Sequence, residues 1–204
     1  MRHGQGKSAR IGKALPRVWL MTDPRVTDAA LMRAIARLPR GAAIVVRHYH
    51  LPPAQRHALF ERIARVARRR GCRVLLAGDP ATARIWGADG HHGPHGRGVI
   101  AAGKPWLHSA PAHDARELRR AVRAGADAVL LSPLFATRSH PGAAPLGPAR
   151  FAALVRHAAV PVIALGGVRP RHAALVRRLG AAGYAAIDGL VGRCTPRDST
   201  DGGG

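Results

Sequence analysis

Two short apolar stretches in the last quarter of the chain each end abruptly in glycine. Val160–Val168 reads VPVIALGGV, and Gly183–Gly189 reads GYAAIDG. Uninterrupted apolar runs of this length, closed by glycine, are typical of parallel strands that are buried on both faces. One helix-length segment separates them, so we expect two parallel neighbours whose turns open at the same edge. Main-chain N–H groups in two such turns, each at the start of a helix, can hold one anion such as a phosphate.

The same strand-then-helix unit recurs along the chain. Strands are predicted at residues 17–24, 42–47, 72–77, 87–92, 106–109, 128–133, 160–168 and 183–189. Helices are predicted to begin at Thr27 or Asp28, at Pro53, after Pro80, at Asp114, at Pro148 and after Val168. Eight such repeats predict an α/β fold whose parallel sheet closes into a compact, single-domain (β/α)₈ TIM barrel. An open doubly wound sheet is the alternative, and the absence of G-x-G-x-x-G after the first strand counts against its dinucleotide-binding version.

The barrel is expected to occupy residues 17–192. Residues 1–16 are predicted to form a basic, flexible N-terminal tail, and residues 193–204 a disordered C-terminal tail. With 204 residues the chain is short for a fold that typically takes about 250. Loops and peripheral helices should therefore be minimal.

The formal net charge of +22 would ordinarily indicate a nucleic-acid partner. Nearly all the basic residues are arginine, however, in a background rich in Ala, Gly and Pro, and aromatic residues make up only 4%. We interpret the charge as a compositional bias and expect no nucleic-acid partner. The two cysteines have no metal-binding or redox spacing, and no apolar run is long enough for a membrane span. We therefore predict a cytoplasmic protein without a membrane partner. The sequence leaves open whether it forms a homodimer.

In a barrel the C-terminal ends of the strands meet at one face, and catalytic side chains gather there. Histidine is unusually frequent among these ends, with twelve in the chain. His48, His50, His91, His92 and His95 could contribute to a divalent metal site with Asp79. Ordinary polar loop histidines are the alternative, which the scatter of histidines along the chain favours.

Arg47 ends a buried strand. A guanidinium that projects into a barrel mouth needs a carboxylate or phosphate partner. Asp79 or an anionic ligand is therefore its expected partner.

Several motifs, in their order and spacing, resemble those of thiamine phosphate synthase and its TenI relatives. They are LMTD at residues 20–23, GADG at 87–90, GADA at 125–128, SPLFAT at 132–137, ALGGV at 164–168 and GAAGYAAI at 180–187. The resemblance implies a (β/α)₈ barrel of thiamine biosynthesis. Its nominal reaction is the Mg²⁺-dependent transfer of a pyrimidine group from its pyrophosphate to a thiazole phosphate, with release of pyrophosphate.

The resemblance also implies roles for the glycine turns. The N–H groups of Gly167, Ile187 and Asp188, with Gly166 in the same turn, would hold the phosphate of a small phosphorylated heterocycle. Thr137 and Ser139 would line the substrate loop.

At the pyrophosphate end, the resemblance implies that Arg47 meets the pyrophosphate and that Asp79 is a magnesium ligand. His92 and His140 would replace cations that the family carries. The family's Asn-Asp-Arg is Gly78-Asp79-Pro80 here, and its second magnesium carboxylate is missing from residues 92–97.

Other family positions differ too. Family lysines are replaced by Tyr49 and His140, and a serine by Asp188, whose carboxylate would repel the phosphate unless turned away. The catalytic histidine of the TenI tautomerases falls at Pro133.

The resemblance thus implies a thiazole phosphate binder, nominally a synthase with a degenerate pyrophosphate and magnesium site. There are two alternatives. One is a TenI-like tautomerase or another histidine-based enzyme, and the other is a non-catalytic barrel that binds a phosphate ligand.

Overall fold

The computed structural model describes residues 15–96, 106–138, 142 and 144–191. The sequence-predicted tails therefore lie outside the described residues, except for residues 15 and 16. No helix within the described ranges is both long and apolar enough to cross a membrane.

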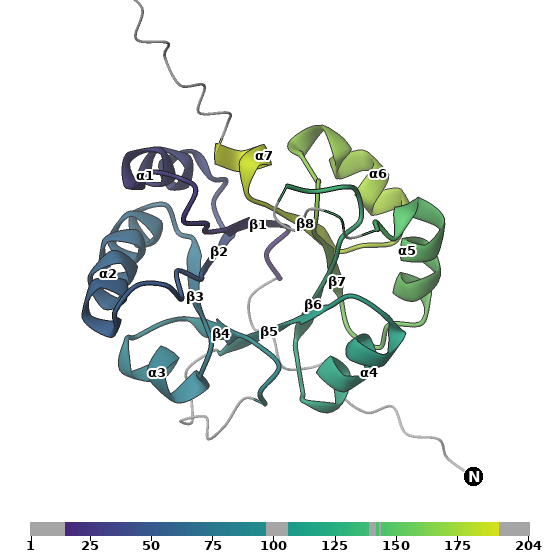
Figure 1. The fold of residues 1–204 in the computed structure, drawn as a ribbon, viewed down its shortest axis with the longest axis horizontal. Helices are drawn as coiled ribbons and strands as arrows, with labels where there is room; N and C mark the ends of the chain where they lie inside the picture. Colours follow the sequence, from purple (N-terminus) through teal and green to yellow (C-terminus); the bar gives the residue numbers. More distant parts are fainter. Residues whose placement is uncertain (1–14, 97–105, 139–141, 143, 192–204) are drawn as a thin grey trace, which may run out of the picture.

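Eight parallel strands close into a barrel in sequence order (Figure 1). They are β1 (Val18–Met21), β2 (Ala43–Val46), β3 (Arg73–Ala77), β4 (Gly90–His92), β5 (Leu107–Ala112), β6 (Ala128–Leu131), β7 (Val162–Ala164) and β8 (Gly183–Ala186). Pairing of Val18 with Tyr184 joins β1 to β8 and closes the ring. The predicted (β/α)₈ barrel is confirmed, and the open-sheet alternative is excluded.

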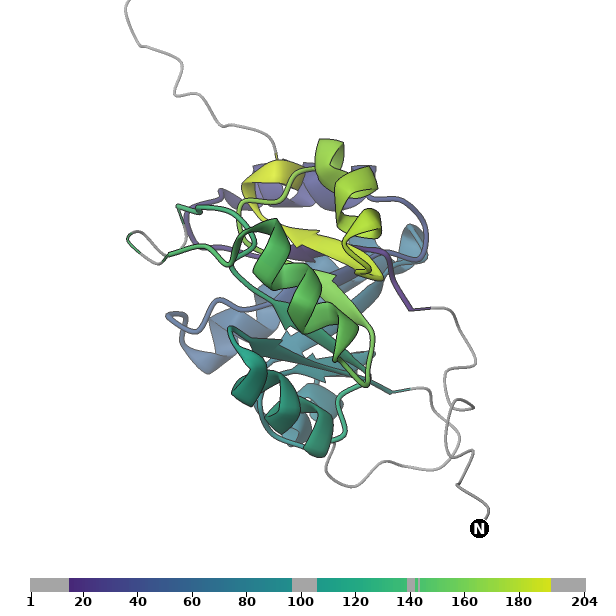
Figure 2. The ribbon, with the colours of Figure 1, turned by 90° about the vertical axis from the view of Figure 1, so that its right-hand side faces the viewer.

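Helices surround the barrel, as Figures 1 and 2 show. They are α1 (Asp28–Arg37), α2 (Pro53–Arg69), α3 (Pro80–Ile85), α4 (Ala115–Arg123), α5 (Gly147–Arg156), the short 3₁₀ turn η1 (Pro170–His172), α6 (Ala173–Arg178) and α7 (Asp188–Val191). Thr27, not Asp28, caps α1, because its Oγ1 accepts a hydrogen bond from the N–H of Ala30. Asp114 caps α4 as expected, accepting from the N–H of Glu117 at 2.8 Å.

Most strands are shorter than predicted, and the fourth and fifth illustrate the two kinds of difference. The fourth strand is limited to Gly90–His92, and the fifth continues to Ala112 instead of ending at residue 109. The extension follows from pairing with β6, where Pro111 lies opposite Leu130 and Ala112 opposite Leu131. Such long-range pairing leaves no periodic signal in a short segment.

Alternate residues of each strand divide the core into an interior and an outer layer. Trp19, Met21, Val45 and Leu130 belong to the cluster that fills the barrel interior. Leu20 instead packs with residues of α1 and α2 in an outer cluster. The filled interior restricts ligands to the rim of the barrel.

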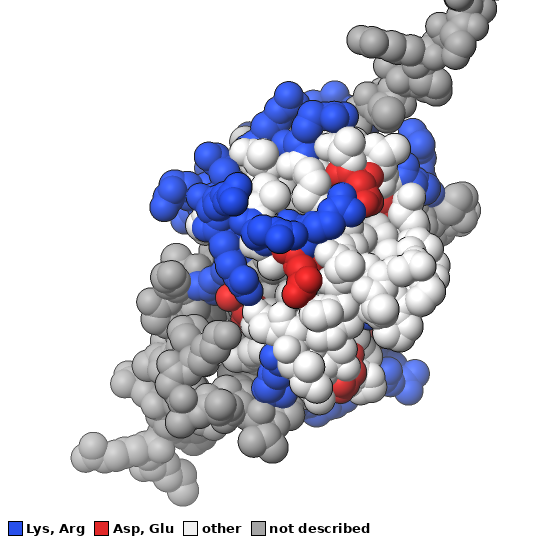
Figure 3. Space-filling model, turned by 90° about the vertical axis from the view of Figure 1, so that its left-hand side faces the viewer, with Lys and Arg blue, Asp and Glu red and all other residues white. Residues whose placement is uncertain are grey.

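The outer face of α2 carries much of the positive charge. Arg62, Arg65, Arg68 and Arg69 are exposed, whereas Ile63 on the opposite side of the helix is fully buried. Figure 3 shows basic side chains gathered over this side of the molecule. Arg70, the residue after α2, is partly buried and donates from Nη2 to the carbonyl of Leu38 at 3.0 Å.

Candidate functional site

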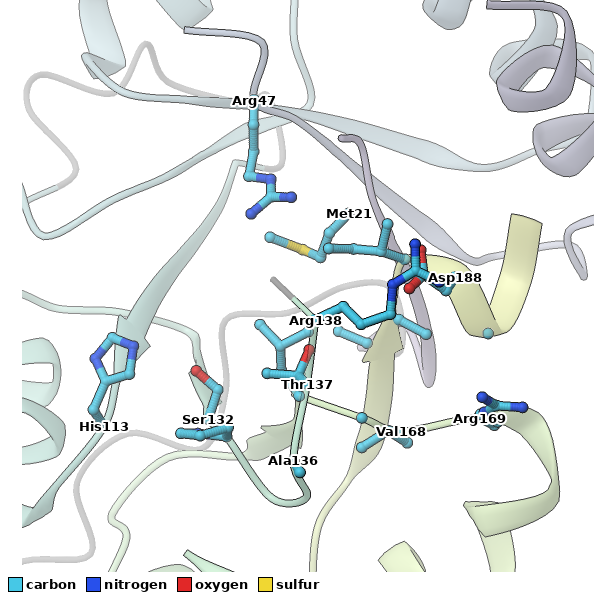
Figure 4. Close-up of a pocket in the computed structure, with 18 residues that line it drawn as sticks. Met21, Arg47, His113, Ser132, Ala136, Thr137, Arg138, Val168, Arg169 and Asp188 are labelled. Carbon is cyan, nitrogen blue, oxygen red and sulfur yellow. The ribbon is translucent and has the colours of Figure 1, made fainter. Parts of the chain in front are cut away.

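A cavity of about 210 Å³ lies at the C-terminal ends of the strands (Figure 4). The end of β1, the residue after β2, and the turns after β6, β7 and β8 contribute its walls. Its lining includes Met21, Arg47, His113, Ser132, Thr137, Arg138, Gly166, Gly167, Arg169, Ile187, Asp188 and Gly189. The two glycine-ended strands therefore face one space, as their sequence predicts.

The turn after β7 can be built only from glycine. Gly166 and Gly167 have φ angles of +89° and +65°. A Cβ at Gly166 would lie 2.6 Å from Pro133, and one at Gly167 would lie 2.5 Å from the carbonyl oxygen of Ala136. Positive φ and close backbone approach are the two conditions that only glycine meets at no cost.

The loop after β6 packs directly on this turn. Leu134 and Phe135 donate their N–H groups to the carbonyls of Leu165 and Gly166, at 2.8 and 3.0 Å. The carbonyls of the turn are thus occupied by the loop that carries Thr137. The cavity wall from Ser132 to Gly167 is in consequence one hydrogen-bonded unit.

Several main-chain donors at the cavity keep their hydrogen-bonding capacity. Within the described part of the chain, the N–H groups of Gly167, Ile187 and Asp188 donate to no main-chain acceptor. All three residues line the cavity. Unused amides in turns that face one space make a cradle for an anionic oxygen.

Asp188 brings a carboxylate to this cradle. Its side chain is exposed. The pKa of Arg25 is raised mainly by the hydrogen bond that Arg25 donates to Asp23, and the charges of Asp23 and Asp188 add to this rise against desolvation. Arg25 and Arg138 line a shallow depression beside the main cavity. The negative charge of Asp188 therefore lies beside a rim of the cavity that carries the basic residues Arg25 and Arg138.

Arg47 is anchored by the residues that end β1. Its N–H donates to Thr22 Oγ1 at 3.0 Å, its Nε donates to the Thr22 carbonyl at 2.7 Å, and its Nη2 donates to Asp23 Oδ2 at 3.0 Å. The partner is Asp23, so the expected pairing with Asp79 is wrong. Burial is the main cause that lowers the pKa of Arg47, and Asp23 opposes it.

Asp23 is shared by two guanidinium groups. Arg25 donates from Nε to Asp23 Oδ1 at 2.8 Å and from Nη2 to Oδ2 at 3.0 Å, while Arg47 also binds Oδ2. Burial tends to raise the pKa of Asp23, but the hydrogen bonds from Arg25 and the charges of both arginines outweigh it and lower the pKa. Two cations held by one carboxylate leave a net positive charge beside the cavity.

Asp79 performs a local structural task. Its Oδ2 accepts hydrogen bonds from the N–H and the hydroxyl of Thr82, at 2.8 and 3.0 Å, and so caps α3. These bonds lower the pKa of Asp79, the main-chain bond first. Asp79 is not among the residues that line the cavity.

His92 faces the barrel interior, since it pairs with the interior residue Ala77 on β3. Its Nδ1 lies 3.0 Å from Ser109 Oγ on β5. Desolvation, followed by the charge of Arg47, lowers the pKa of His92 to about 3. The ring of His92 is therefore uncharged near neutral pH. It suits a hydrogen bond better than the role of a replacement cation, which was expected for it from the sequence.

His91 points the other way, as strand alternation predicts. Its ring stacks on His108 with centroids 4.2 Å apart, and its Nδ1 accepts a hydrogen bond from Trp106 Nε1 at 3.1 Å. Burial is the main cause that lowers the pKa of His91 to about 4. Across the described ranges, no three His, Cys, Asp or Glu residues gather in a metal-binding group.

The remaining predicted residues divide into two groups. Thr137 lines the cavity, whereas Ser139 and His140 lie outside the described residues. Sequence reasoning did not select Arg138 and Arg169, which also line the cavity. Their position directly after the Thr137 and Val168 motifs was the available signal.

A closed ring of eight parallel strands, with a cavity at their C-terminal ends, defines a (β/α)₈-barrel protein whose site lies where barrel enzymes hold their substrates. The family model described as "Thiamine monophosphate synthase" matches residues 18–190. The chain therefore belongs to the thiamine monophosphate synthase and TenI family.

Individual relatives agree with this assignment. The chain is 30% identical to a thiamine-phosphate synthase of Chloroflexus aurantiacus, with 86% of this chain and 85% of the relative covered. It is 32% identical to a thiamine-phosphate synthase of Thiobacillus denitrificans, with 80% and 81% covered. A solved thiamine phosphate pyrophosphorylase from Pyrococcus furiosus superposes with a TM-score of 0.69 over 88% of both chains at 21% identity, a likeness of fold.

Proposed function

We propose that this protein binds a thiazole phosphate in the cavity and transfers a pyrimidine group to it from a pyrimidine pyrophosphate, with release of pyrophosphate. The observation that supports the proposal most directly is the pair of turns after β7 and β8. Their free N–H groups at Gly167, Ile187 and Asp188 face one cavity, opposite the guanidinium of Arg47. One anion cradle and one cation, on two sides of a small space, match two anionic substrates.

The phosphate of the thiazole would accept hydrogen bonds from the turn amides. Such a cradle orients the ligand at little entropic cost, because the carbonyls of Leu165 and Gly166 are already hydrogen-bonded to the loop after β6. Thr137, on the same loop, lies where it can contact the ring or the phosphate.

The departing pyrophosphate would gain negative charge as its bond to the pyrimidine methylene breaks. Arg47 is the lining cation on the far side from the amide cradle, and Arg25 shares its carboxylate partner. A fixed guanidinium whose hydrogen bonds are already oriented stabilises developing charge without reorganisation.

Magnesium stays a proposal that rests on Asp79. Mg²⁺ prefers octahedral oxygen coordination, usually with one or two carboxylates and the substrate's phosphates. At the end of β3 the described residues offer one exposed carboxylate, that of Asp79. Its Oδ2 already caps α3. They do not assemble the expected metal site by themselves, so no step above depends on it.

Calorimetric titration tests the function. We expect binding of the thiazole phosphate alone, then pyrophosphate release when the pyrimidine pyrophosphate is added, measured with and without Mg²⁺. Thiazole phosphate binding without release would favour the tautomerase or non-catalytic alternatives. Failure to bind the thiazole phosphate would overturn the proposal.

A further inference from the structure

Arg56 lies in the first turn of α2 and extends its side chain across the ends of two strands. Its Nε donates to the carbonyl of Arg47 at 2.7 Å, and its Nη2 donates to the carbonyl of Ala77 at 2.6 Å. A longer contact of 3.4 Å joins Nη2 to the carbonyl of Val46. One guanidinium therefore binds the C-terminal ends of both β2 and β3.

This placement is not explained by helix stability. A cation near a helix N-terminus opposes the helix macrodipole, and α2 has no acidic residue in its first turn. In the described part of the chain, no carboxylate forms an ion pair with Arg56. Its charge is instead stabilised by carbonyl dipoles and by the faces of Tyr49 and Trp86, whose ring centroids lie 5.0 and 5.8 Å from Cζ.

The carbonyls that Arg56 binds belong to segments that carry candidate site residues. Arg47 is itself one acceptor, and Ala77 is followed directly by Gly78 and Asp79. Arg47 reaches its own partners, Thr22 and Asp23, from the other side of the chain. Its main chain is thus fixed by Arg56 and its guanidinium by the end of β1.

We propose that Arg56 is a positioning residue that holds Arg47 in the geometry needed to meet the anionic group of the second substrate. The inference rests on the proposed function, which makes Arg47 the cation for a pyrophosphate. Arg56 does not line the cavity, so it acts through the main chain of Arg47. The planar fork of arginine is required, because a lysine ammonium cannot span the same two carbonyls in fixed geometry.

Binding of inorganic pyrophosphate, measured by calorimetry, tests this role in a double-mutant cycle. We expect Arg56→Met to weaken binding about tenfold, and Arg56→Lys to weaken it by a smaller factor. In an Arg47→Ala background the same replacements should have little further effect. Arg65→Met, on the exposed side of the same helix, is the matched control and should bind as the wild type does.

Equal losses in both backgrounds, or no loss from Arg56→Met, would overturn the proposal. Exchange of the Arg47 Nε proton, followed by NMR on arginine-labelled protein, gives a readout without any ligand. We expect faster exchange in Arg56→Met and Arg56→Lys but not in Arg65→Met, and unchanged exchange would also overturn the proposal. If the wild type binds no pyrophosphate, the proposed function fails, and the NMR comparison still decides whether Arg56 positions Arg47.

Discussion

The two sides of the cavity are built from different parts of the chain. At the ends of β7 and β8 the potential ligand groups are main-chain amides, and their position is set by glycines that no other residue can replace. At the ends of β1 and β2 they are side chains, and Arg47 is placed by Asp23, Thr22 and Arg56. The first side tolerates little change in sequence. The second can change its electrostatics through single substitutions while the fold persists.

The largest expected effect comes from Gly167→Ala on the main-chain side. The new Cβ would meet Ala136 O and Phe135 Cβ at 2.5 and 2.8 Å, at a φ of +65°. We expect thiazole phosphate binding to weaken by more than about a hundredfold, close to 3 kcal/mol, in calorimetry. Gly41→Ala, at a φ of +79° with nothing within 4 Å, carries the same backbone strain away from the cavity. Equal binding by the two variants would show that the turn after β7 does not hold the ligand.

Asp23→Asn tests the side-chain side. The substitution removes the charge that two guanidiniums share, and it leaves the partly buried Arg47 without a counter-ion. We expect the free energy of unfolding to fall by about 2 kcal/mol in urea denaturation, less than for a fully buried pair. Pyrophosphate release should fall while thiazole phosphate binding is retained.

The exposed pair Asp28–Arg62, joined at 2.8 Å, provides the control. Asp28→Asn should cost no more than about 0.5 kcal/mol, since exposed ion pairs contribute little. Equal losses for Asp23→Asn and Asp28→Asn would mean that the carboxylate at the mouth has no special role.

The buried histidines of β4, which lie outside the cavity, should make the stability of the barrel depend on pH. Burial keeps His91 neutral with its pKa lowered from 6.5 to about 4, so the unfolded chain takes up more protons than the folded chain between these values. The contribution of His91 to stability is therefore constant above about pH 6.5 and declines as the pH falls toward 4, by about 1–2 kcal/mol at pH 5.

Urea denaturation as a function of pH measures this decline. His91→Asn should make the decline shallower, while the buried His92, whose pKa is lowered to about 3, keeps the remainder. His157→Asn, at an exposed position, should leave the decline unchanged. An unchanged slope in His91→Asn would contradict the buried neutral ring.

Asp188→Asn should have the smallest effect. It removes a carboxylate beside the amide cradle while keeping the main-chain N–H in place. Because Asp188 is exposed, its repulsion of a phosphate is screened, and we expect affinity for thiazole phosphate to rise only about two- to threefold at low salt. Glu61→Gln, an exposed change on α2, should leave the affinity as it is, and weaker binding by Asp188→Asn would show that its carboxylate contacts the ligand favourably.

The sequence predicted the main-chain side better than the side-chain side, for a physical reason. Glycine turns and buried strands are local patterns, so the convergence of residues 166–168 and 187–189 followed once the barrel was inferred. The partner of Arg47 is a long-range choice between β1 and β3, the two neighbours of β2, and both strands lead into an aspartate. Sequence periodicity places Asp23 and Asp79 at the same face, but it does not determine which carboxylate turns toward the guanidinium.

Local bonding explains the choice. Asp79 precedes Pro80 and Thr82 and is used as a helix cap, which leaves Asp23 for Arg47. Alternation along β4 separated His91 from His92, but their lowered pKa values depend on burial that only the packed structure reveals. The β5 boundary was misjudged because pairing with β6, and not composition, extends that strand.

The carboxylate shared by Arg25 and Arg47 means that the mouth carries its own resident anion. An incoming pyrophosphate would share the Arg47 guanidinium with Asp23 and compete with it for the positive charge, so it meets a cation that already has a partner. A group with several oxygens and more than one negative charge can compete with a two-pronged internal partner, whereas a singly charged one gains little. Selectivity for polyanionic leaving groups would then come from competition inside the protein.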